Sequence, residues 1–224
     1  MEVFIELLTK GLDRKALNRL RKLYHNIVGR SSHAMTKSRS RSRVNDIKHI
    51  LDTLSNQCMF LDIGCGDGSI TRSITEYLGL PRHRAHAVDV ITQNPSDLYT
   101  FSSTNGKILD YESNSFDIVT IFMASHHFEY PVHMFKEIYR VIKPGGMLVI
   151  REHDIVYSEQ RMFIDLAHVM YANVINDEGD IGPLWYRTAK EWSSLITSVG
   201  FIEKELKKQY DIFQSYYAVY VTSS

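Results

Sequence analysis

Two acidic residues and a group of closely spaced glycines are the first candidates for chemistry in this sequence. Asp62 is followed by glycines at 64, 66 and 68, and Asp89 ends the next apolar run along the chain. Glycines at alternate positions let the main chain turn sharply and let a ligand approach the backbone without meeting a Cβ atom. A carboxylate after the following strand can accept hydrogen bonds from both hydroxyls of a ribose. The pattern therefore predicts a nucleoside-binding turn, a feature that dinucleotide and mononucleotide sites share.

This glycine turn has to be held between a strand and a helix. Apolar residues at 58–61 lead up to Asp62, and residues 69–78 carry apolar side chains at helical spacing. Strand-like and helix-like segments then alternate along the chain, which is typical of a parallel sheet covered by helices. In such sheets ligands lie beyond the carboxyl ends of the strands, where these candidate residues fall.

The fold class follows from the order of the segments. We expect strands at 58–62, 85–90, 116–122 and 147–150, and two strands that pair in antiparallel fashion at 201–209 and 216–222. We expect helices at 44–54, 69–78, 96–101, 131–142, 163–174 and 192–199, the last ended by a glycine. The prediction is an α/β fold: a Rossmann-like, doubly wound, mostly parallel sheet with an antiparallel C-terminal edge hairpin and an N-terminal helical extension.

Basic residues are concentrated before the glycine turn, although Lys and Arg balance Asp and Glu over the whole chain. Residues 10–48 hold twelve Lys or Arg and only two acids. We therefore divide the chain into a basic N-terminal helical extension with a Ser-Arg loop, residues 1–48, and a main domain, residues 49–224. The Ser-Arg run is either a solvated loop or an anion-binding arm over the site, and in the second case Arg39, Arg41 and Arg43 contact the substrate.

Composition excludes several other classes of protein. With 44% hydrophobic and 23% charged residues, the 224-residue chain is typical of a globular protein. No apolar run approaches the roughly 18 residues that a membrane span needs. Cys58 and Cys65 do not form a CxxC pair, which argues against a disulfide scaffold and favours a reducing, cytoplasmic location.

Four motifs resemble those of class I S-adenosylmethionine-dependent methyltransferases, in the ubiquinone-biosynthesis-like (type 11) branch. They are LDIGCGDG at 61–68, AVDV at 87–90, the segment 104–117 that ends in SFD, and EIYRVIKPGG at 137–146. A dehydrogenase would more often show the glycine spacing G-x-G-x-x-G. The resemblance implies an enzyme with S-adenosylmethionine as its cofactor.

The resemblance also implies a set of cofactor contacts. The glycine turn would pack against the methionine part, Asp62 would lie near the ammonium group, and Asp89 would hold the ribose. Asn105 stands where the family often has an Asp that accepts from the adenine amino group, but its amide could instead face away. Met123 would line the channel to the sulfonium or simply pack in the core. The implied cofactor-binding residues are Asp62, Gly64, Cys65, Gly66, Gly68, Asp89, Val90, Asn105, Gly106, Met123 and Ala124.

Methyl transfer from a sulfonium is an in-line displacement, so positioning can supply much of the catalysis. A general base is needed only when the acceptor must lose a proton. His127, Glu152 and His153 follow predicted strands and are the catalytic candidates, while His126 is a candidate substrate contact. Alternatively, the double histidine only fills a loop. These residues lack the spacing of known metal ligands, so we expect no metal.

The acceptor is the least determined part of the prediction. Basic charge before the first motif suits RNA, including a cap guanine, or another phosphate-rich molecule, with binding that weakens as salt rises. A small-molecule methyltransferase is the alternative, because the branch with the most similar motifs methylates small molecules. A third hypothesis is a non-catalytic domain that binds the cofactor, or keeps only the fold, and serves a partner protein.

Overall fold

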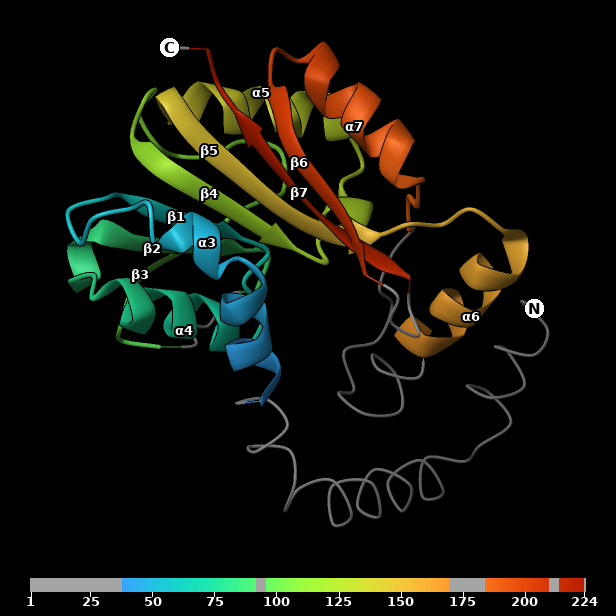
Figure 1. Ribbon diagram of the computed structural model, residues 1–224, viewed down its shortest axis with the longest axis horizontal. Helices are drawn as coiled ribbons and strands as arrows, with labels where there is room; N and C mark the ends of the chain where they lie inside the picture. The colour runs from blue at the N-terminus through green and yellow to red at the C-terminus, as the bar shows by residue number, and fades with distance from the viewer. Residues whose placement is uncertain (1–37, 92–95, 170–183, 210–213, 224) are drawn as a thin grey trace.

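The protein is described by a computed structural model that covers residues 38–91, 96–169, 184–209 and 214–223 (Figure 1). Its seven strands form one sheet in the order β3-β2-β1-β4-β5-β7-β6. The first five strands pair in parallel, and β7 runs antiparallel between β5 and β6. The predicted α/β class and the antiparallel C-terminal edge hairpin are confirmed. The predicted N-terminal extension up to residue 37 lies outside the described residues.

The strands are β1 (Phe60–Ile63), β2 (Ala85–Asp89), β3 (Thr100–Ser103), β4 (Phe116–Phe122), β5 (Ile142–His153), β6 (Ile202–Gln209) and β7 (Ser215–Val221). The helices are α3 (Lys48–Leu51), α4 (Ser69–Leu78), α5 (Pro131–Val141), α6 (Ser158–Val169) and α7 (Ala189–Ser198), with 3₁₀ turns η1 (Arg82–Arg84) and η2 (Ser125–His127). Most lie within a few residues of their predicted positions. β5 extends further than expected, so residues 151–153 belong to the strand.

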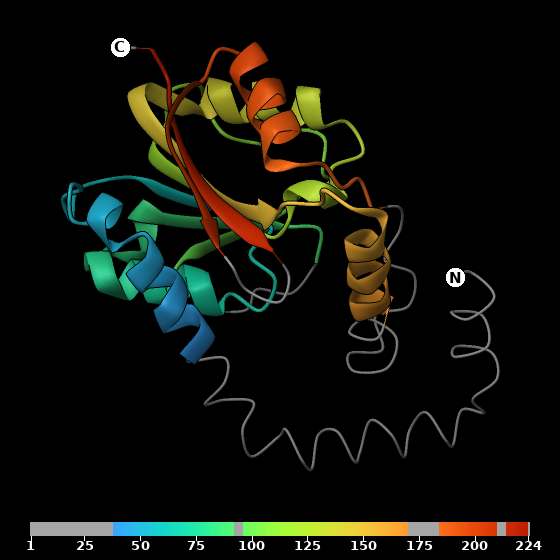
Figure 2. The same ribbon diagram turned by 45° about the vertical axis from the view of Figure 1, so that its right-hand side comes forward.

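Helices cover both faces of the sheet (Figures 1 and 2). On one face α5 and α7 pack through Phe135, Ile138 and Trp192, which are fully buried. On the other face α3 and α4 pack through Leu51 and Ile74. α6 lies beyond the carboxyl end of β5, apart from both helical layers (Figure 1). Among the described helices, none combines the length and the apolar content required to cross a lipid bilayer.

The helix predicted at 96–101 is wrong. Residues 97–99 form a turn, and Thr100–Ser103 is the edge strand β3, which pairs in parallel with β2 from His86 to Asp89. The short segment has no helical periodicity strong enough to compete with the backbone hydrogen bonds that the edge of the sheet offers.

The loop predicted for the Ser-Arg run is also wrong where the structure describes it. Residues 38–46 are helical, and we call this stretch the Ser-Arg helix. Its buried residues are Ser40 and Val44, one helical turn apart, and Ile47, which follows the helix, is buried as well. Val44 and Ile47 belong to the same core as α4, so burial of these residues holds the polar run in a helix. The division of the chain at residue 48 stays a prediction.

Candidate functional site

The glycine turn connects β1 to α4 at the centre of the sheet. The backbone N–H of Gly64 donates to the Val88 carbonyl over 2.8 Å, and that of Gly68 donates to the Cys65 carbonyl over 2.9 Å. Gly64 has a φ of +74°, and a Cβ atom there would lie 2.4 Å from the Cβ of Ala124. Glycine is therefore required at position 64 both by its backbone conformation and by close packing against the end of β4.

Asp89 joins the glycine turn to the end of β2. Its Oδ2 accepts a hydrogen bond from the Gly66 N–H over 2.7 Å, and its Oδ1 accepts from the Val90 N–H over 2.7 Å. This places a carboxylate beside the turn at the carboxyl ends of two adjacent strands. That is where a ribose-binding acid is expected, and the ribose contact stays a prediction.

Asp62 is buried at the end of β1 and makes contacts within the protein. Its carboxylate accepts hydrogen bonds from the Thr71 hydroxyl at 2.5 Å and from the Thr120 hydroxyl at 2.6 Å. Burial raises the pKa of Asp62 to about 6, although both hydrogen bonds lower it. The described contacts make Asp62 a link between β1, β4 and α4, and its predicted contact with an ammonium group is untested.

Cys65, also predicted at the cofactor, has a buried thiol. Burial, followed by the nearby carboxylates of Asp62 and Asp89, raises the pKa of the Cys65 thiol far above its ordinary value. The thiol is therefore neutral at physiological pH and acts as a small apolar side chain of the turn.

Val90 and Gly106 lie side by side at the ends of β2 and β3. Val90 is 68% exposed, and a Cβ atom on Gly106 would lie 4.0 Å from its side chain. Asn105 is exposed, and its Oδ1 accepts from the backbone N–H groups of Lys107 and Ile108 at 2.9 and 3.3 Å. The Asn105 side-chain carbonyl thus accepts hydrogen bonds within its own turn. Its predicted contact with an adenine would therefore need a hydrogen-bonding site of the amide that this turn does not use.

The end of β4 abuts the glycine turn. Met123 is half-buried with a φ of 57°, a left-handed conformation that is costly for a non-glycine residue, and its N–H donates to the Arg151 carbonyl over 2.8 Å. The next residue, Ala124, is the one that Gly64 packs against. Ala124 therefore borders the turn directly and Met123 precedes it in the chain, and their predicted contact with the cofactor channel stays a prediction.

Glu152, near the end of β5, and His126, in η2 after β4, form a buried pair. The Glu152 Oε1 lies 2.7 Å from the His126 Nδ1, and the carboxylate also accepts the backbone N–H groups of His126 and His153 at 3.2 and 2.8 Å. Burial opposes ionisation of Glu152, but the charge and hydrogen bond of His126 outweigh it and hold the pKa of Glu152 below its ordinary value. With its oxygens engaged in this way, Glu152 is suited to orienting His126.

His127 is the exposed histidine of η2. Desolvation of the ring, followed by electrostatic repulsion from His126 and His168, lowers the pKa of His127 to about 4. The ring is therefore neutral at physiological pH and able to accept a proton, although as a weak base. His153, the third catalytic candidate, is buried at the end of β5.

Sequence reasoning missed two residues of this region, His168 and Tyr186. The Nε2 of His168 lies 3.2 Å from the Nε2 of His126, and the Tyr186 hydroxyl lies 3.1 Å from the His168 Nδ1. They come from α6 and from the segment before α7, so no local spacing links them to His126. Only the position of α6 beyond the strand ends brings them there.

The Ser-Arg helix lies beside the glycine turn. Arg39 forms an ion pair of 3.3 Å with Asp67, and both side chains are about half exposed. Arg43 pairs with Asp46 at 3.6 Å, and Arg41 is exposed. The structure thus places Arg39 at the turn and Arg41 on the surface of the helix, whereas Arg43 is turned toward its own helix.

The comparisons with known proteins agree with this arrangement. Residues 61–150 match the family model of the methyltransferase domain. This matched segment is a methyltransferase domain of the class I S-adenosylmethionine-dependent kind. The cofactor of this family is S-adenosylmethionine.

Individual relatives of this chain differ in the molecules that their names describe. The chain is 23% identical over 163 residues to a malonyl-[acyl-carrier protein] O-methyltransferase of Brevibacillus brevis, covering 67% of this chain and 57% of the relative. It is 29% identical over 109 residues to ribosomal RNA-processing protein 8 of Arabidopsis thaliana, covering 49% and 34%. The chain therefore spans only about a third to just over half of these relatives.

A solved structure shows the same fold. It is the complex between the Trm112 methyltransferase activator of Haloferax volcanii and a methyltransferase, matched with a TM-score of 0.62 at 18% identity over 84% of this chain and 95% of that one. At this identity the likeness establishes only the fold of this chain.

The residues at the turn fit S-adenosylmethionine. A Cβ atom on Gly66 would meet nothing within 4 Å, so the space over the turn is open, and the Asp89 carboxylate lies beside it. Exposed Val90 offers an apolar surface next to Gly106, against which an adenine ring can pack. These residues would hold the methionine part, the ribose and the adenine, respectively.

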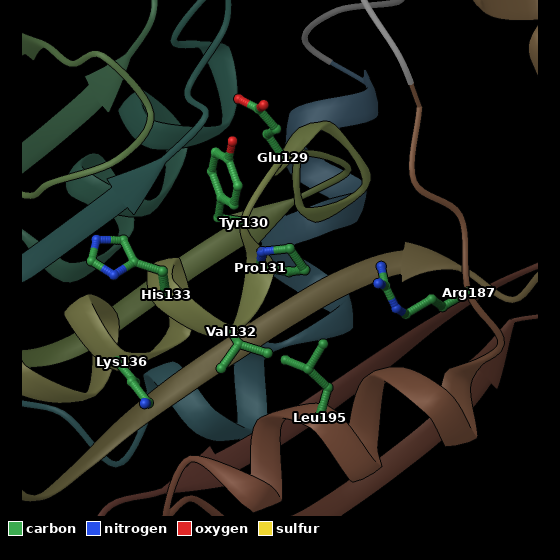
Figure 3. A pocket seen from close by; sticks show the side chains of 8 residues that line it. All are labelled: Glu129, Tyr130, Pro131, Val132, His133, Lys136, Arg187 and Leu195. Atoms are coloured by element: carbon green, nitrogen blue, oxygen red, sulfur yellow. The ribbon is translucent and has the colours of Figure 1, made fainter.

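A separate groove of about 460 Å³ lies between the start of α5 and α7 (Figure 3). It is lined by Glu129, Tyr130, Pro131, Val132, His133, Lys136, Arg187 and Leu195. Its lining contains none of the residues predicted for the cofactor, so this groove is distinct from the candidate cofactor site.

Proposed function

We propose that this chain is an active methyltransferase whose acceptor binds beyond the carboxyl ends of β4 and β5. The observation that carries the proposal is the junction of Gly66, Asp89 and the end of β4 at one edge of the sheet. A cofactor seated over the turn would direct its reactive group toward Met123 and the histidines that follow it.

In the proposed mechanism the protein mainly positions the two reactants. S-adenosylmethionine supplies a methyl group that its sulfonium charge already activates. Asp89 and the glycine turn fix the donor, and the end of β4 aligns the acceptor for in-line displacement. Where the acceptor must lose a proton, neutral His127 is the exposed group that can take it, while Glu152 holds the adjacent His126 in place.

We further propose that the acceptor is RNA or another phosphate-rich molecule. The support is the position of the Ser-Arg helix, whose Arg39 reaches the glycine turn through Asp67. Arginine is well suited to phosphate because its planar guanidinium presents several donors. The RNA-processing relative is a second, weaker support.

The alternative acceptor is a small molecule. It is favoured by relatives that are named for malonyl-[acyl-carrier protein] and for phosphoethanolamine. In that case the Ser-Arg helix would serve as a wall of the site. The third hypothesis is a non-catalytic role as the subunit of a partner protein. One matched structure is a complex of a methyltransferase with its activator, so the chain should be tested with and without cell extract, which can supply a partner.

The deciding experiment offers labelled S-adenosylmethionine to the protein together with total RNA, total protein or a small-molecule extract. We expect label in RNA, lost in Asp89→Ala. Label in the small-molecule fraction alone would establish the alternative. Cofactor binding without transfer to any fraction, even with added extract, would support the non-catalytic hypothesis.

RNA binding is tested separately from transfer. We expect the affinity to fall steeply with salt and to weaken when Arg39, Arg41 and Arg43 are replaced together by Gln. The matched control replaces Lys190, Lys204 and Lys207, three exposed lysines on α7 and β6, by Gln. Equal affinities for the two triple variants would contradict the role of the Ser-Arg helix.

A further inference from the structure

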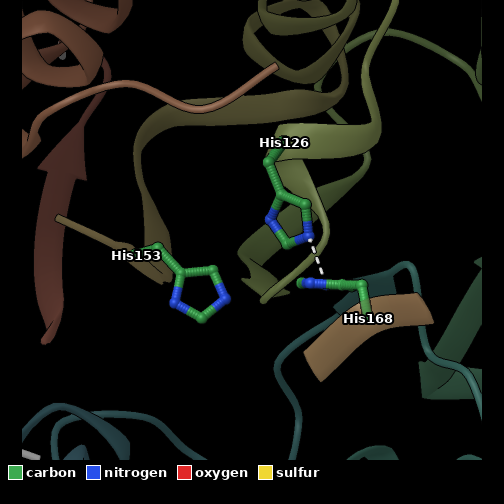
Figure 4. Close-up of side chains that lie close together, drawn as sticks. All are labelled: His126, His153 and His168. Atoms are coloured by element: carbon green, nitrogen blue, oxygen red, sulfur yellow. Dashed lines mark hydrogen bonds between the residues drawn. The ribbon is translucent and has the colours of Figure 1, made fainter. Parts of the chain in front are cut away.

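Three histidines from separate elements meet beyond the strand ends. His126 lies in η2, His153 ends β5 and His168 lies in α6, and one ring nitrogen of each is within 4.8 Å of the other two (Figure 4). His126 and His153 are buried, and His168 is half-buried. We call these three residues the histidine cluster.

The hydrogen-bond partners of two of these rings limit where their protons can lie. A carboxylate can only accept, so the His126 Nδ1 that faces Glu152 at 2.7 Å must carry a hydrogen. The His168 Nδ1 faces the backbone carbonyl of Ile164 at 3.0 Å, which also can only accept. The Tyr186 hydroxyl also lies 3.1 Å from the His168 Nδ1, and it can donate to that nitrogen when the His168 proton is on Nε2.

When the His168 proton is on Nδ1, both Nε2 atoms of the neutral rings carry lone pairs, and these atoms face each other at 3.2 Å (Figure 4). Two lone pairs at this distance repel unless a cation lies between them. The cation is either an additional proton or a metal ion. Nδ1 atoms held by a carboxylate and by a backbone carbonyl are also the arrangement found behind metal-binding histidines.

Geometry favours the metal ion over the proton. Zinc–nitrogen bonds of about 2.0–2.1 Å at tetrahedral angles place two ligand nitrogens roughly 3.3 Å apart, close to the separation of these two Nε2 atoms. A shared proton would account for two histidines only. A metal ion also gives a role to the third ring nitrogen, which lies within 4.8 Å of the other two and would have to move closer to become a ligand.

We propose that His126, His153 and His168 bind one divalent transition-metal ion, with zinc the best match, and that Glu152 orients His126 for this purpose. Three nitrogen ligands leave a further position for water or for a donor atom of a bound molecule. This revises the expectation of no metal, which considered the spacing of residues 126, 127 and 153 without His168. The proposal goes beyond methyl transfer and does not depend on it.

The test measures metal binding directly on the full chain. Chelator-treated protein is dialysed against Zn²⁺ and bound metal is counted by elemental analysis, and Co²⁺ provides visible absorption bands that report tetrahedral ligation. We expect one ion per chain and a rise in melting temperature with Zn²⁺. His168→Gln should lower the affinity at least 100-fold, and Glu152→Gln should lower it about 10- to 100-fold by releasing His126.

His127→Gln is the matched control, because it removes a neighbouring histidine outside the cluster. It should keep the stoichiometry and the Co²⁺ spectrum. Circular dichroism of each metal-free variant establishes that it is folded. If the folded wild-type protein binds no ion, or if His127→Gln loses as much affinity as His168→Gln, the proposal is wrong, and the first outcome would leave a shared proton as the explanation of the 3.2 Å contact.

Discussion

At the scale of single residues, Gly64 shows how one hydrogen atom in place of a side chain shapes the site. A methyl group at this position would overlap Ala124 and would also sit on a backbone with φ of +74°. We expect Gly64→Ala to lower the free energy of unfolding by about 2–5 kcal/mol, from backbone strain and overpacking together, and to abolish cofactor binding.

Gly145→Ala is the matched control for this prediction. Gly145 has the same φ of +74°, but a Cβ atom there would meet nothing within 4 Å. It should therefore cost only the backbone strain, about 1 kcal/mol. Equal losses for the two variants in urea denaturation would show that packing against Ala124 is unimportant.

Burial of Asp62 makes the free energy of unfolding depend on pH, and the sign of this dependence follows from the pKa of Asp62. Its pKa of about 6 in the folded state exceeds its ordinary value, so between pH 4 and 6 the folded state binds more protons than the unfolded state. The free energy of unfolding should therefore fall as pH rises through this range, by roughly 3 kcal/mol from this group.

Asp62→Asn should remove this dependence. The free energy of unfolding is measured for both proteins without cofactor, by urea denaturation from pH 4 to 8. As the pH rises, the wild type should lose stability relative to the variant. Asp110→Asn, which removes an exposed carboxylate, should follow the wild-type profile. A constant difference between wild type and Asp62→Asn would contradict the burial effect.

At the scale of elements, α7 depends on a capping box at its first turn. The Thr188 hydroxyl accepts from the Glu191 N–H, and the Glu191 carboxylate accepts from the Thr188 N–H. Buried Asp154 at the end of β5 adds a third contact, because its Oδ1 accepts from the Ala189 N–H over 2.8 Å. The start of α7 is thus joined to the strand that carries Glu152 and His153.

Thr188→Ala should lower the free energy of unfolding by about 1 kcal/mol, because it leaves the Glu191 N–H without its capping acceptor. Thermal or urea denaturation measures this. The control is Ser194→Ala at an exposed position within α7, which should be neutral or slightly stabilising because alanine favours helices. A destabilisation by Ser194→Ala as large as that by Thr188→Ala would argue against the cap.

At the scale of the whole molecule, cofactor binding should stabilise the fold, because the site is made of residues from several strands. S-adenosylmethionine or its demethylated product at about 100 times its Kd should add about 2.7 kcal/mol and raise the Tm by roughly 5–10 °C. Differential scanning fluorimetry measures the shift.

Asp89→Ala should lose most of this shift, because the variant lacks both the proposed ribose contact and the hydrogen bond to the Gly66 N–H. Asp110→Ala should keep it. We expect calorimetry to give a 10- to 100-fold weaker affinity for Asp89→Ala, the worth of one or two charged hydrogen bonds. An unchanged affinity would place the cofactor elsewhere.

Sequence by itself determined the central elements of this protein and the order of its motifs. The strand before Asp62, the helix from Ser69 and the helix from Pro131 were predicted because apolar periodicity and terminating residues act within one element. The glycine turn and Asp89 could be predicted as well, since in a parallel sheet the carboxyl ends of successive strands meet at one edge.

Only the tertiary structure decided the remaining features. β3 forms because β2 offers an open edge, and the Ser-Arg helix forms because Val44 and Ile47 pack into the domain core. His168 reaches His126 from a helix 42 residues further along the chain. These contacts depend on burial and on partners far apart in the chain, and such partners leave no local pattern in a single sequence.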